Sequence, residues 1–267
     1  MSRMSTSPSP DRQAASNPPP AGGVQSVNRA LDVLEFIGSR HPDVPIGEIA
    51  TGLRLPLPTV HRLLATLSER GYTRQLPSRR YSLGFRVLPL AECARALIGP
   101  VAERVLLDLV DETGETANLA VLAGDQAEYV AQAPSRHHMR MFTEIGQRVD
   151  LHSTGVGKAL LSQLDSAQVD DLLDRRGLPQ RTEHTITSRV RLHAELERIR
   201  SAGFAIDEQE QELGVRCVAV PIAGLSSRMA VSVSGPVTRM TESLVESTVP
   251  LLQSAARALA GSLERSD

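Results

Sequence analysis

Apolar residues recur at helical spacing in three short segments near the start of the chain, and this pattern predicts three amphipathic helices. The segments are residues 24–38, 46–53 and 59–71. The third closes on Gly71, the residue type best suited to a left-handed cap at the end of a helix. Two β-prone runs follow at 72–75 and 80–83, joined by the turn sequence LPSR. Three helices and a hairpin in this order predict a winged helix-turn-helix domain over residues 24–85.

The pattern changes beyond residue 85. Apolar spacing at 86–99 predicts a linker helix, and Pro100 opens a further helix. Short runs bounded by Gly, Pro or Asp then predict β-strands, at 116–124, 128–134, 138–146, 215–224 and 228–236. Three helical stretches follow the run 138–146, at 156–164, 166–175 and 189–202, and a fourth follows the run 228–236, at 242–263. Strands, inserted helices and strands again predict an α+β domain on an antiparallel sheet, over residues 100–265.

Composition narrows the class of protein. Of 267 residues, 41% are hydrophobic and 22% are charged, which are values of a globular protein, and no apolar run reaches the roughly 18 residues of a membrane helix. Cys93 and Cys217 are the only cysteines, too few for a disulfide framework or a thiolate zinc site. We therefore expect a cytoplasmic protein without a membrane partner, metal or cofactor. Residues 1–23 hold five Pro and five Ser without a branched aliphatic residue, so we expect a disordered tail.

Charge is distributed unevenly along the chain. Residues 1–90 carry 11 arginines and 6 acidic residues, a net charge of +5, whereas residues 91–267 carry 18 basic and 25 acidic residues, a net charge of −7. Lys158 is the only lysine, so arginine supplies nearly all the positive charge. A basic N-terminal part followed by an acidic C-terminal part indicates that the N-terminal part contacts nucleic acid and that the C-terminal part has a different function.

The third predicted helix and the hairpin carry the candidate DNA contacts. The exposed helix face offers donors to base edges and phosphates, and the arginines at the hairpin suit the DNA backbone. An ordinary solvated helix face is the alternative, but the arginines that follow this helix within about 25 residues favour DNA. The candidate DNA-binding residues are Thr59, His61, Arg62, Thr66, Arg74, Arg79 and Arg80.

The segment HSTGVGKALL superficially resembles a phosphate-binding loop. It lacks the first loop glycine, and Ala159 stands where the magnesium-binding Ser or Thr would be, which argues against nucleotide hydrolysis. Two interpretations stay open for Gly155 to Gly157: backbone N–H groups that bind a small anion, or a glycine turn needed for close packing.

Other residues in the second half also have two interpretations. Cys217 is either a small buried hydrophobe or a nucleophile, although no local signature supplies a base. Ser232 and Ser234 project from one strand face and either line a polar pocket or face solvent. Asp207 begins the run DEQEQE, which on its own is typical of a solvated acidic loop.

Taken together and in this order, the motifs resemble the IclR family of bacterial transcriptional regulators over about residues 24–262. The segments that carry the resemblance are GVQSVNRALDVL, LPLPTVHRLLATLSERGY, YSLG, GETANLAVL, LHSTGVGKALL, DEQEQELGVRCVAVPI and VSVSGP. The resemblance implies an N-terminal winged helix-turn-helix, a linker helix and a GAF/PAS-like effector-binding domain. It also implies a dimer or homotetramer, a dimer of dimers, that binds a palindromic double-stranded DNA operator and a small-molecule effector.

The effector half is most similar to the branch that senses glyoxylate or allantoin-pathway acids. By that resemblance, the polar contacts to a small carboxylate such as glyoxylate or allantoate are Gly155, Val156, Asp207, Cys217, Ser232 and Ser234. An apolar wall would come from Met141, Val149 and Val215. The chain departs from the family at Asp150, where proline is common, and from the branch at Val156, where alanine is common. An ionised Asp207 repels a carboxylate, so Asp207 must accept a hydrogen bond from the ligand or be protonated.

The leading hypothesis is an effector-responsive DNA-binding regulator, a repressor of small-acid catabolic genes, and not an enzyme. One alternative is a family member that responds to another carboxylate or an aromatic acid, or that activates transcription. Two others come from different classes: a small-molecule hydrolase that uses Cys217, and a purely architectural DNA binder.

Overall fold

The computed structural model describes residues 24–40, 42–141 and 143–263 and divides the chain into two units, residues 1–93 and 94–267. The tail that we expected to be disordered, residues 1–23, lies outside the described residues.

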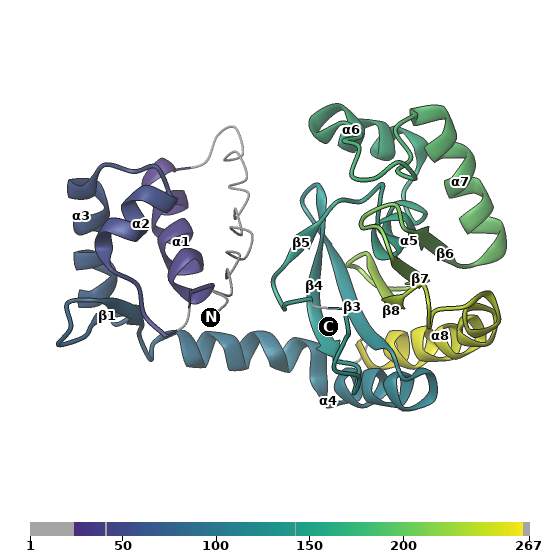
Figure 1. Cartoon of the computed structure of the whole chain (residues 1–267), viewed down its shortest axis with the longest axis horizontal. Coiled ribbons are helices and arrows are strands. Elements are labelled where there is room, and N and C mark those ends of the chain that lie inside the picture. Colours follow the sequence, from purple (N-terminus) through teal and green to yellow (C-terminus); the bar gives the residue numbers. More distant parts are fainter. Residues whose placement is uncertain (1–23, 41, 142, 264–267) are drawn as a thin grey trace, which may run out of the picture. The chain divides into compact units, whose positions relative to one another are not determined.

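The first unit contains three helices and a small hairpin (Figure 1). Its elements are α1 (Gln25–Gly38), α2 (Ile46–Gly52), α3 (Leu57–Glu69), β1 (Thr73–Gln75) and β2 (Tyr81–Leu83). The two strands are antiparallel. Val44 forms an isolated antiparallel bridge with Tyr81, through two backbone hydrogen bonds of 2.8 Å. Gly71 has a φ of 77° directly after α3, as predicted for a left-handed cap. The winged helix-turn-helix prediction is confirmed.

The apolar positions of the three helices meet in one core. Its buried members are Val33, Phe36, Ile37, Val44, Ile49, Val60, Leu64, Leu67 and Tyr81. Pro58 lies in the first turn of α3, where the amide hydrogen that proline lacks has no intrahelical acceptor. The proline therefore starts the helix without interrupting it.

The helix α4 (Val87–Thr113) connects the two units. Gly99 interrupts it with φ 72° and ψ 162°, a combination that is not helical and that glycine tolerates best. Pro100 then opens the second part of the helix, as the sequence predicted.

The second unit is built on a six-stranded sheet with the order β5-β4-β3-β8-β7-β6, in which every neighbouring pair is antiparallel. The strands are β3 (Thr116–Ala123), β4 (Gln126–Ala133), β5 (Arg148–Val149), β6 (Ala205–Glu208), β7 (Val215–Ile222) and β8 (Met229–Pro236). The helices are α5 (Gly155–Leu161), α6 (Ser166–Arg176), α7 (Arg189–Ala202) and α8 (Glu242–Leu263), besides the second part of α4. The predicted α+β domain on an antiparallel sheet is confirmed.

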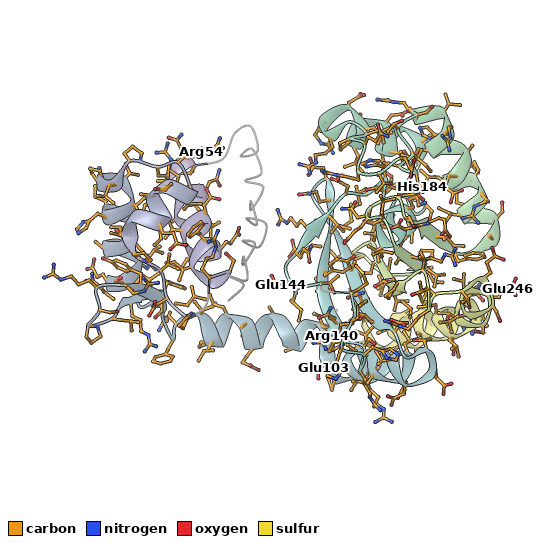
Figure 2. All side chains as sticks on the ribbon, in the orientation of Figure 1. Arg54, Glu103, Arg140, Glu144, His184 and Glu246 are labelled. Atoms are coloured by element: carbon orange, nitrogen blue, oxygen red, sulfur yellow. The ribbon has the colours of Figure 1, made fainter. Side chains whose placement is uncertain are left out.

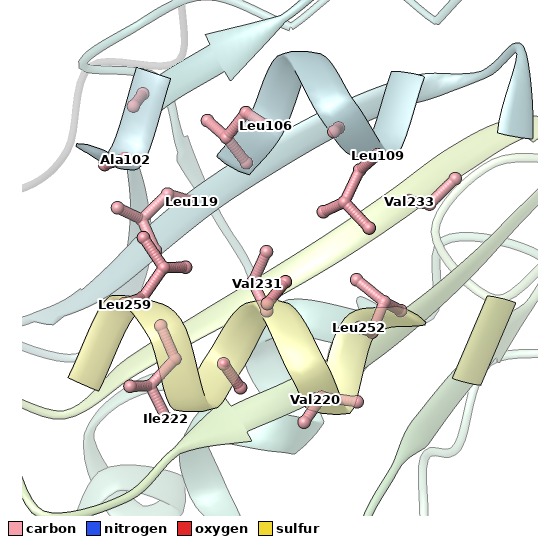
Figure 3. Packing of buried hydrophobic residues seen from close by; sticks show 14 of the residues in the cluster. Ala102, Leu106, Leu109, Leu119, Val220, Ile222, Val231, Val233, Leu252 and Leu259 are labelled. Atoms are coloured by element: carbon pink, nitrogen blue, oxygen red, sulfur yellow. The ribbon is translucent and has the colours of Figure 1, made fainter. Parts of the chain in front are cut away.

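Helices cover both faces of this sheet. On one face, α8 and the second part of α4 pack branched aliphatic side chains against the strands (Figure 3). On the other face, α5, α6 and α7 enclose a second apolar cluster that includes several alanines of the strands. Alternate residues of each strand point to opposite faces, so the same strands build both layers.

Three elements differ from the prediction. The predicted strand at 138–146 is wrong: its described residues belong to a loop between β4 and β5, which turns at Gly146 with a φ of 87°. The short strand β5 was not predicted. Conversely, Asp207 lies in strand β6 and is buried, whereas its sequence context favoured an acidic loop.

Candidate functional site

The helix α3 has a buried face and an exposed face. Val60, Leu64 and Leu67 lie in the core, whereas His61 and Arg62 are exposed on the opposite side. The remaining helix candidates differ: Thr59 is half-buried, and the exposed Thr66 donates its hydroxyl to the carbonyl oxygen of Arg62 (3.2 Å). His61 and Arg62 therefore present the helix donors most accessible to a ligand in solution.

The arginines of the hairpin are not equivalent. Arg80 donates to the Asp43 carboxylate and, over 2.8 Å, to the Asp43 carbonyl oxygen. Arg74 donates to Ser82 Oγ (3.0 Å), and its guanidinium carbon lies 4.8 Å from the centroid of the Phe85 ring. Arg79 sits in the turn with a φ of 60°, and Gln75 Nε2 donates to its carbonyl oxygen (3.4 Å). Its guanidinium has no hydrogen bond or ion pair with a described residue. Arg79 is thus free to contact another molecule, while Arg80 and Arg74 already support the hairpin.

Sequence reasoning missed one exposed arginine of this unit. Arg54 lies in the turn between α2 and α3, has a φ of 52°, and projects from the ribbon (Figure 2). A non-glycine residue with positive φ is uncommon and often marks a functional turn. Its only signal in the sequence is its place between two predicted helices.

In the second unit, polar side chains from four strands gather on the sheet face that α5 covers. Asp207 of β6, Cys217 of β7 and Ser234 of β8 are register partners in one row. Ser232 and Asn118 are partners in the next row. We call these five residues the polar row. It contains all four polar side chains predicted for the effector site and adds Asn118, which is buried in strand β3.

Gly155 opens α5 directly against the polar row. A Cβ atom on Gly155 would lie 2.9 Å from Cys217 Sγ and 3.3 Å from the Cys217 carbonyl oxygen, so only glycine fits. The Val156 amide approaches the same thiol, and the Val156 side chain lies in the aliphatic cluster behind. Close packing therefore accounts for the glycine itself, and it brings the backbone of α5 to the predicted effector contacts.

Burial shapes the acid–base properties of this site. Burial raises the pKa of Asp207 to about 7, although amide donors at Glu210 (2.7 Å) and Gln211 (3.4 Å) partly oppose the rise. Burial also raises the pKa of the Cys217 thiol to about 12, which makes this thiol a poor nucleophile. The pKa of Tyr129 rises for the same reason, with Cys217 and Asp207 nearby. An Asp207 that is partly protonated at neutral pH can donate a hydrogen bond to a carboxylate ligand. The repulsion expected between an ionised Asp207 and such a ligand is then avoided.

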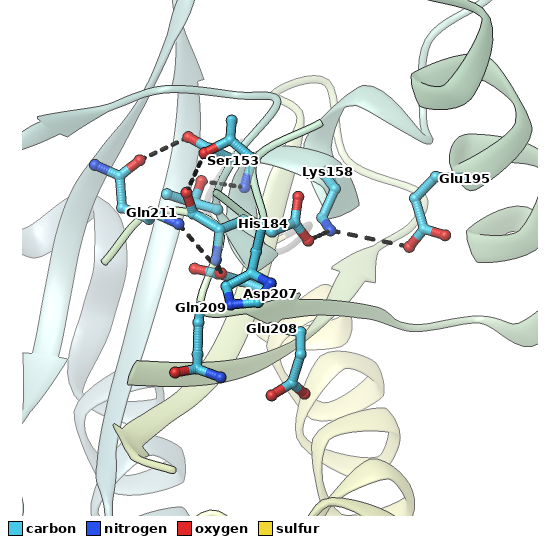
Figure 4. A network of polar contacts seen from close by, with 12 residues as sticks. Ser153, Lys158, His184, Glu195, Asp207, Glu208, Gln209 and Gln211 are labelled. Carbon is cyan, nitrogen blue, oxygen red and sulfur yellow. Dashed lines mark hydrogen bonds and ion pairs between the residues drawn. The ribbon is translucent and has the colours of Figure 1, made fainter. Parts of the chain in front are cut away.

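Polar contacts hold the loop that follows β6, next to the polar row (Figure 4). The ammonium of Lys158 forms an ion pair with the Glu210 carboxylate and lies 3.9 Å from Glu195 Oε1. Ser153 donates to Gln211 Oε1 (2.6 Å), and Thr185 donates to the Glu210 carbonyl oxygen (2.6 Å). The only lysine of the chain is therefore buried and holds the loop that carries the amide donors to Asp207.

Two buried side-chain oxygens, Ser232 Oγ and Glu210 Oε2, have no nitrogen or oxygen hydrogen-bond partner among the described residues. The polar neighbour of Ser232 Oγ is the Cys217 thiol, which is a weak hydrogen-bonding group. Buried polar atoms are almost always paired, and an unpaired one costs about 1–3 kcal/mol. Ser232 belongs to the polar row, and Glu210 carries an amide donor to Asp207. Both unpaired atoms thus lie at or next to the row.

The three predicted apolar wall residues lie in different surroundings. Val215 precedes Cys217 by two residues in β7 and so shares its face of the sheet. Val149 in β5 lies in the aliphatic cluster of the α5 face. Met141 is half-buried in the β4–β5 loop, and no interaction of its side chain with the polar row is seen among the described residues.

Asp150, which stands where the family commonly has proline, binds arginines and not the polar row. Its carboxylate accepts from Arg181 Nε (2.7 Å) and lies 3.5 Å from an Arg176 nitrogen. Asp150 and Arg176 border a small hollow beside α6 that includes none of the predicted effector contacts. The extra negative charge is therefore compensated by arginines.

In the described part of the chain, no helix is both long enough and apolar enough to span a bilayer. No cluster of three or more His, Cys, Asp or Glu residues there is arranged to hold a metal ion.

Comparison with known proteins places both units in one family. The model of the IclR helix-turn-helix domain matches residues 26–77, and that of the bacterial transcriptional regulator IclR C-terminal domain matches residues 93–260. The transcriptional repressor IclR of Escherichia coli is 36% identical over 244 residues, 88% of each chain. The transcriptional repressor AllR of E. coli is 28% identical over 261 residues, 94% of this chain and 95% of that protein.

Solved structures agree with the sequence comparison. The crystal structure of Thermotoga maritima IclR has a TM-score of 0.72 and 29% identity, and the match covers 89% of this chain and 98% of that one. These relatives are regulators and not enzymes, which removes the hydrolase alternative. The chain belongs to the IclR family of DNA-binding bacterial transcriptional regulators.

Proposed function

We propose that this regulator represses small-acid catabolic genes and that a small carboxylate, with glyoxylate and allantoate as first candidates, releases it from DNA. The observation that carries the proposal is the unpaired hydroxyl of Ser232, buried in the polar row. A carboxylate oxygen would pair this hydroxyl, and the amides at Gly155 and Val156 and a protonated Asp207 would supply further donors. Several donors that converge among buried apolar side chains suit a small acid better than a large neutral ligand.

The DNA contacts that we propose are unequal in role. His61 and Arg62 would read base edges from α3 in the major groove. Arg79 and Arg54, both exposed, would contact the phosphate backbone. Arg80 would act on DNA mainly by holding the hairpin, because Asp43 already binds its guanidinium.

We further propose that the first unit forms a symmetric dimer that reads a palindrome. Apolar side chains are exposed along one side of α1 and its N-cap, and at and just before the start of α4, namely Val24, Val27, Leu31, Phe85, Leu88 and Leu90. Contiguous exposed apolar surface often marks a protein interface. A two-fold dimer would relate two α3 helices by the symmetry of a palindromic operator.

The effector role is tested with the full chain and a labelled fragment of its own promoter, by fluorescence anisotropy with and without each acid. We expect a releasing acid to weaken DNA binding and, because linkage is reciprocal, to bind more weakly when DNA is present. Calorimetry measures the affinity for the acid with and without DNA, since the chain has no tryptophan whose fluorescence could report binding. Equal acid affinity on free and DNA-bound protein would contradict the proposal.

The DNA role is tested by comparing Arg79→Ala with Arg80→Ala over a range of salt concentrations. A lost phosphate contact lowers the slope of log affinity against log salt by about 0.9. We expect this loss for Arg79→Ala on every sequence, whereas Arg80→Ala mainly lowers the thermal stability of the first unit. An unchanged salt slope for Arg79→Ala would remove it from the phosphate contacts.

A further inference from the structure

A chain of buried hydrogen bonds runs into the polar row from the β4–β5 loop. Gln132 Nε2 donates to Thr143 Oγ1, and Thr143 Oγ1 donates to Asn118 Oδ1 (2.8 Å). Asn118 Nδ2 then donates to Ser234 Oγ (3.4 Å). Asn118 and Thr143 are buried, and Gln132 is half-buried. We call the side chains of Gln132, Thr143 and Asn118 the relay.

Each link of the relay determines the direction of the next. The amide nitrogen of Gln132 can only donate, so the Thr143 oxygen accepts and must send its own proton onward. The Asn118 carbonyl oxygen can only accept that proton, which turns the Asn118 amide nitrogen toward Ser234. Ser234 therefore accepts from Asn118, and its own proton is left to be donated.

The proton of Ser234 has no acceptor among the described residues. Ser234 is the register partner of Cys217, and Cys217 is that of Asp207, so the hydroxyl lies in the proposed effector site. The hydroxyl oxygen keeps a second lone pair, but its proton is not yet used in a hydrogen bond to a described residue. A ligand atom that accepts a hydrogen bond therefore pairs with Ser234 most favourably.

We propose that the relay presents the Ser234 proton to the effector, so that the site favours an acid, whose two carboxylate oxygens only accept, over the corresponding primary amide, whose nitrogen only donates. Gln132, Thr143 and Asn118 act as positioning residues, because they reach the effector only through Ser234. This inference rests on the proposed effector function. It adds to that function by assigning the selection of the acid form to Gln132, Thr143 and Asn118, which lie outside the predicted effector contacts.

The first experiment pairs Thr143→Val with Thr143→Ser in the full chain. Calorimetry on the wild type identifies the tightest binder among glyoxylate, allantoate, acetate and 4-hydroxybenzoate, and the primary amide of that acid is the second probe. Valine keeps the shape of threonine but removes the donor to Asn118, so Ser234 can point its proton at Asn118. A hydrogen bond to a charged group contributes about 1.5–3 kcal/mol, so we expect Thr143→Val to weaken acid binding about tenfold or more.

Selectivity separates this role from a general structural one. We expect the affinity for the amide to change less than about twofold in Thr143→Val, and Thr143→Ser to match the wild type for both probes. An equal loss for acid and amide, or no loss for either, would overturn the inference while leaving the effector site in place. If no acid of the panel binds the wild type, the proposed effector class fails, and the inference fails with it.

Gln132→Glu provides a second variant that leaves Thr143 intact. Its carboxylate would accept the Thr143 proton and so reverse every later link, which leaves Ser234 donating to Asn118. Because Gln132 is half-buried, the new charge has access to water. We expect the same fall in the acid-to-amide affinity ratio as in Thr143→Val, and an unchanged ratio in both variants would contradict the relay.

Discussion

The two faces of the six-stranded sheet are made by the same strands but have different chemistry. Toward α4 and α8, strands β3 and β8 present Leu119, Val231 and Val233, which are buried in a continuous aliphatic core. Toward α5, the alternate positions of these strands carry Asn118, Ala120, Ala230, Ser232 and Ser234. Large side chains interlock on the first face, whereas small and hydroxyl-bearing ones on the second leave unpaired polar atoms. The first face maintains the fold, and we propose that the second was kept for a ligand.

The largest effect that we expect on stability comes from the aliphatic face. Leu119→Ala removes a fully buried side chain and should lower the free energy of unfolding by about 2–5 kcal/mol. Leu107→Ala is the matched control, because Leu107 is 49% exposed in α4 and should change stability by no more than about 0.5 kcal/mol. Urea unfolding measures both. Equal effects would mean that the aliphatic face is not the main source of stability.

The next effect comes from close packing at the polar row. Gly155→Ala places a Cβ atom against Cys217 Sγ and should cost about 1–3 kcal/mol of stability. Gly47→Ala is the control, since a Cβ atom there meets nothing within 4 Å and alanine favours a helix. Adding Cys217→Ala to Gly155→Ala should recover part of the loss. Strictly additive effects of the two changes would show that the thiol is not the obstacle.

Asp207 should make stability depend on pH. Its folded pKa of about 7 exceeds the ordinary value of 3.8, so between these values only the folded state keeps the proton. Unfolding then releases a proton, and stability contributed by Asp207 falls as pH rises from about 4 to about 7, by at most about 1.4 kcal/mol per pH unit. Asp207→Asn should abolish this slope. The difference between wild type and variant isolates Asp207 from other titrating groups, and a difference that does not vary with pH would contradict a raised pKa.

The smallest effect on stability belongs to Ser232. Because its hydroxyl meets only the weakly hydrogen-bonding Cys217 thiol, Ser232→Ala should leave the free energy of unfolding within about 0.5 kcal/mol or raise it, while weakening acid binding by about 1–3 kcal/mol. Ser135→Ala is the contrast: Ser135 is also buried but donates to the Gly114 carbonyl oxygen (2.6 Å), so we expect lost stability and unchanged acid binding. A stability loss as large for Ser232→Ala as for Ser135→Ala would mean that Ser232 serves the fold.

The regular alternation of the strands explains why most of the fold could be predicted from the sequence. Strands β3, β7 and β8 alternate toward two covered faces, and the helix spacing in α1 and α3 points to one core. The run 138–146 resembles a strand in composition, yet Thr143 turns inward to bind Asn118 and Gly146 turns the chain. Strand β6 was missed because a buried Asp207 looks like a solvated acid until its neighbours in space are known.

The residues alone left two interpretations open for Cys217, Ser232 and Ser234, and only the family resemblance proposed them as effector contacts. Neither route indicated Asn118 or Tyr129, although both lie in strands that the sequence predicted. Asn118 had one signal, an amide within the otherwise mostly apolar run TANLAVLA. Its partners Thr143 and Ser234 are 25 and 116 positions away, so only the folded sheet brings them together.

The burial of Lys158 has a practical consequence for chemical labelling. It is the only lysine, and its side chain is 1% exposed. Amine-directed reagents such as succinimidyl esters therefore meet no accessible lysine on the folded chain. Acylation of this single ammonium group requires the loop at Glu210 to open. The rate at which an acyl group appears on the peptide that contains Lys158 thus measures that opening, and a bound acid that tightens the loop would slow it.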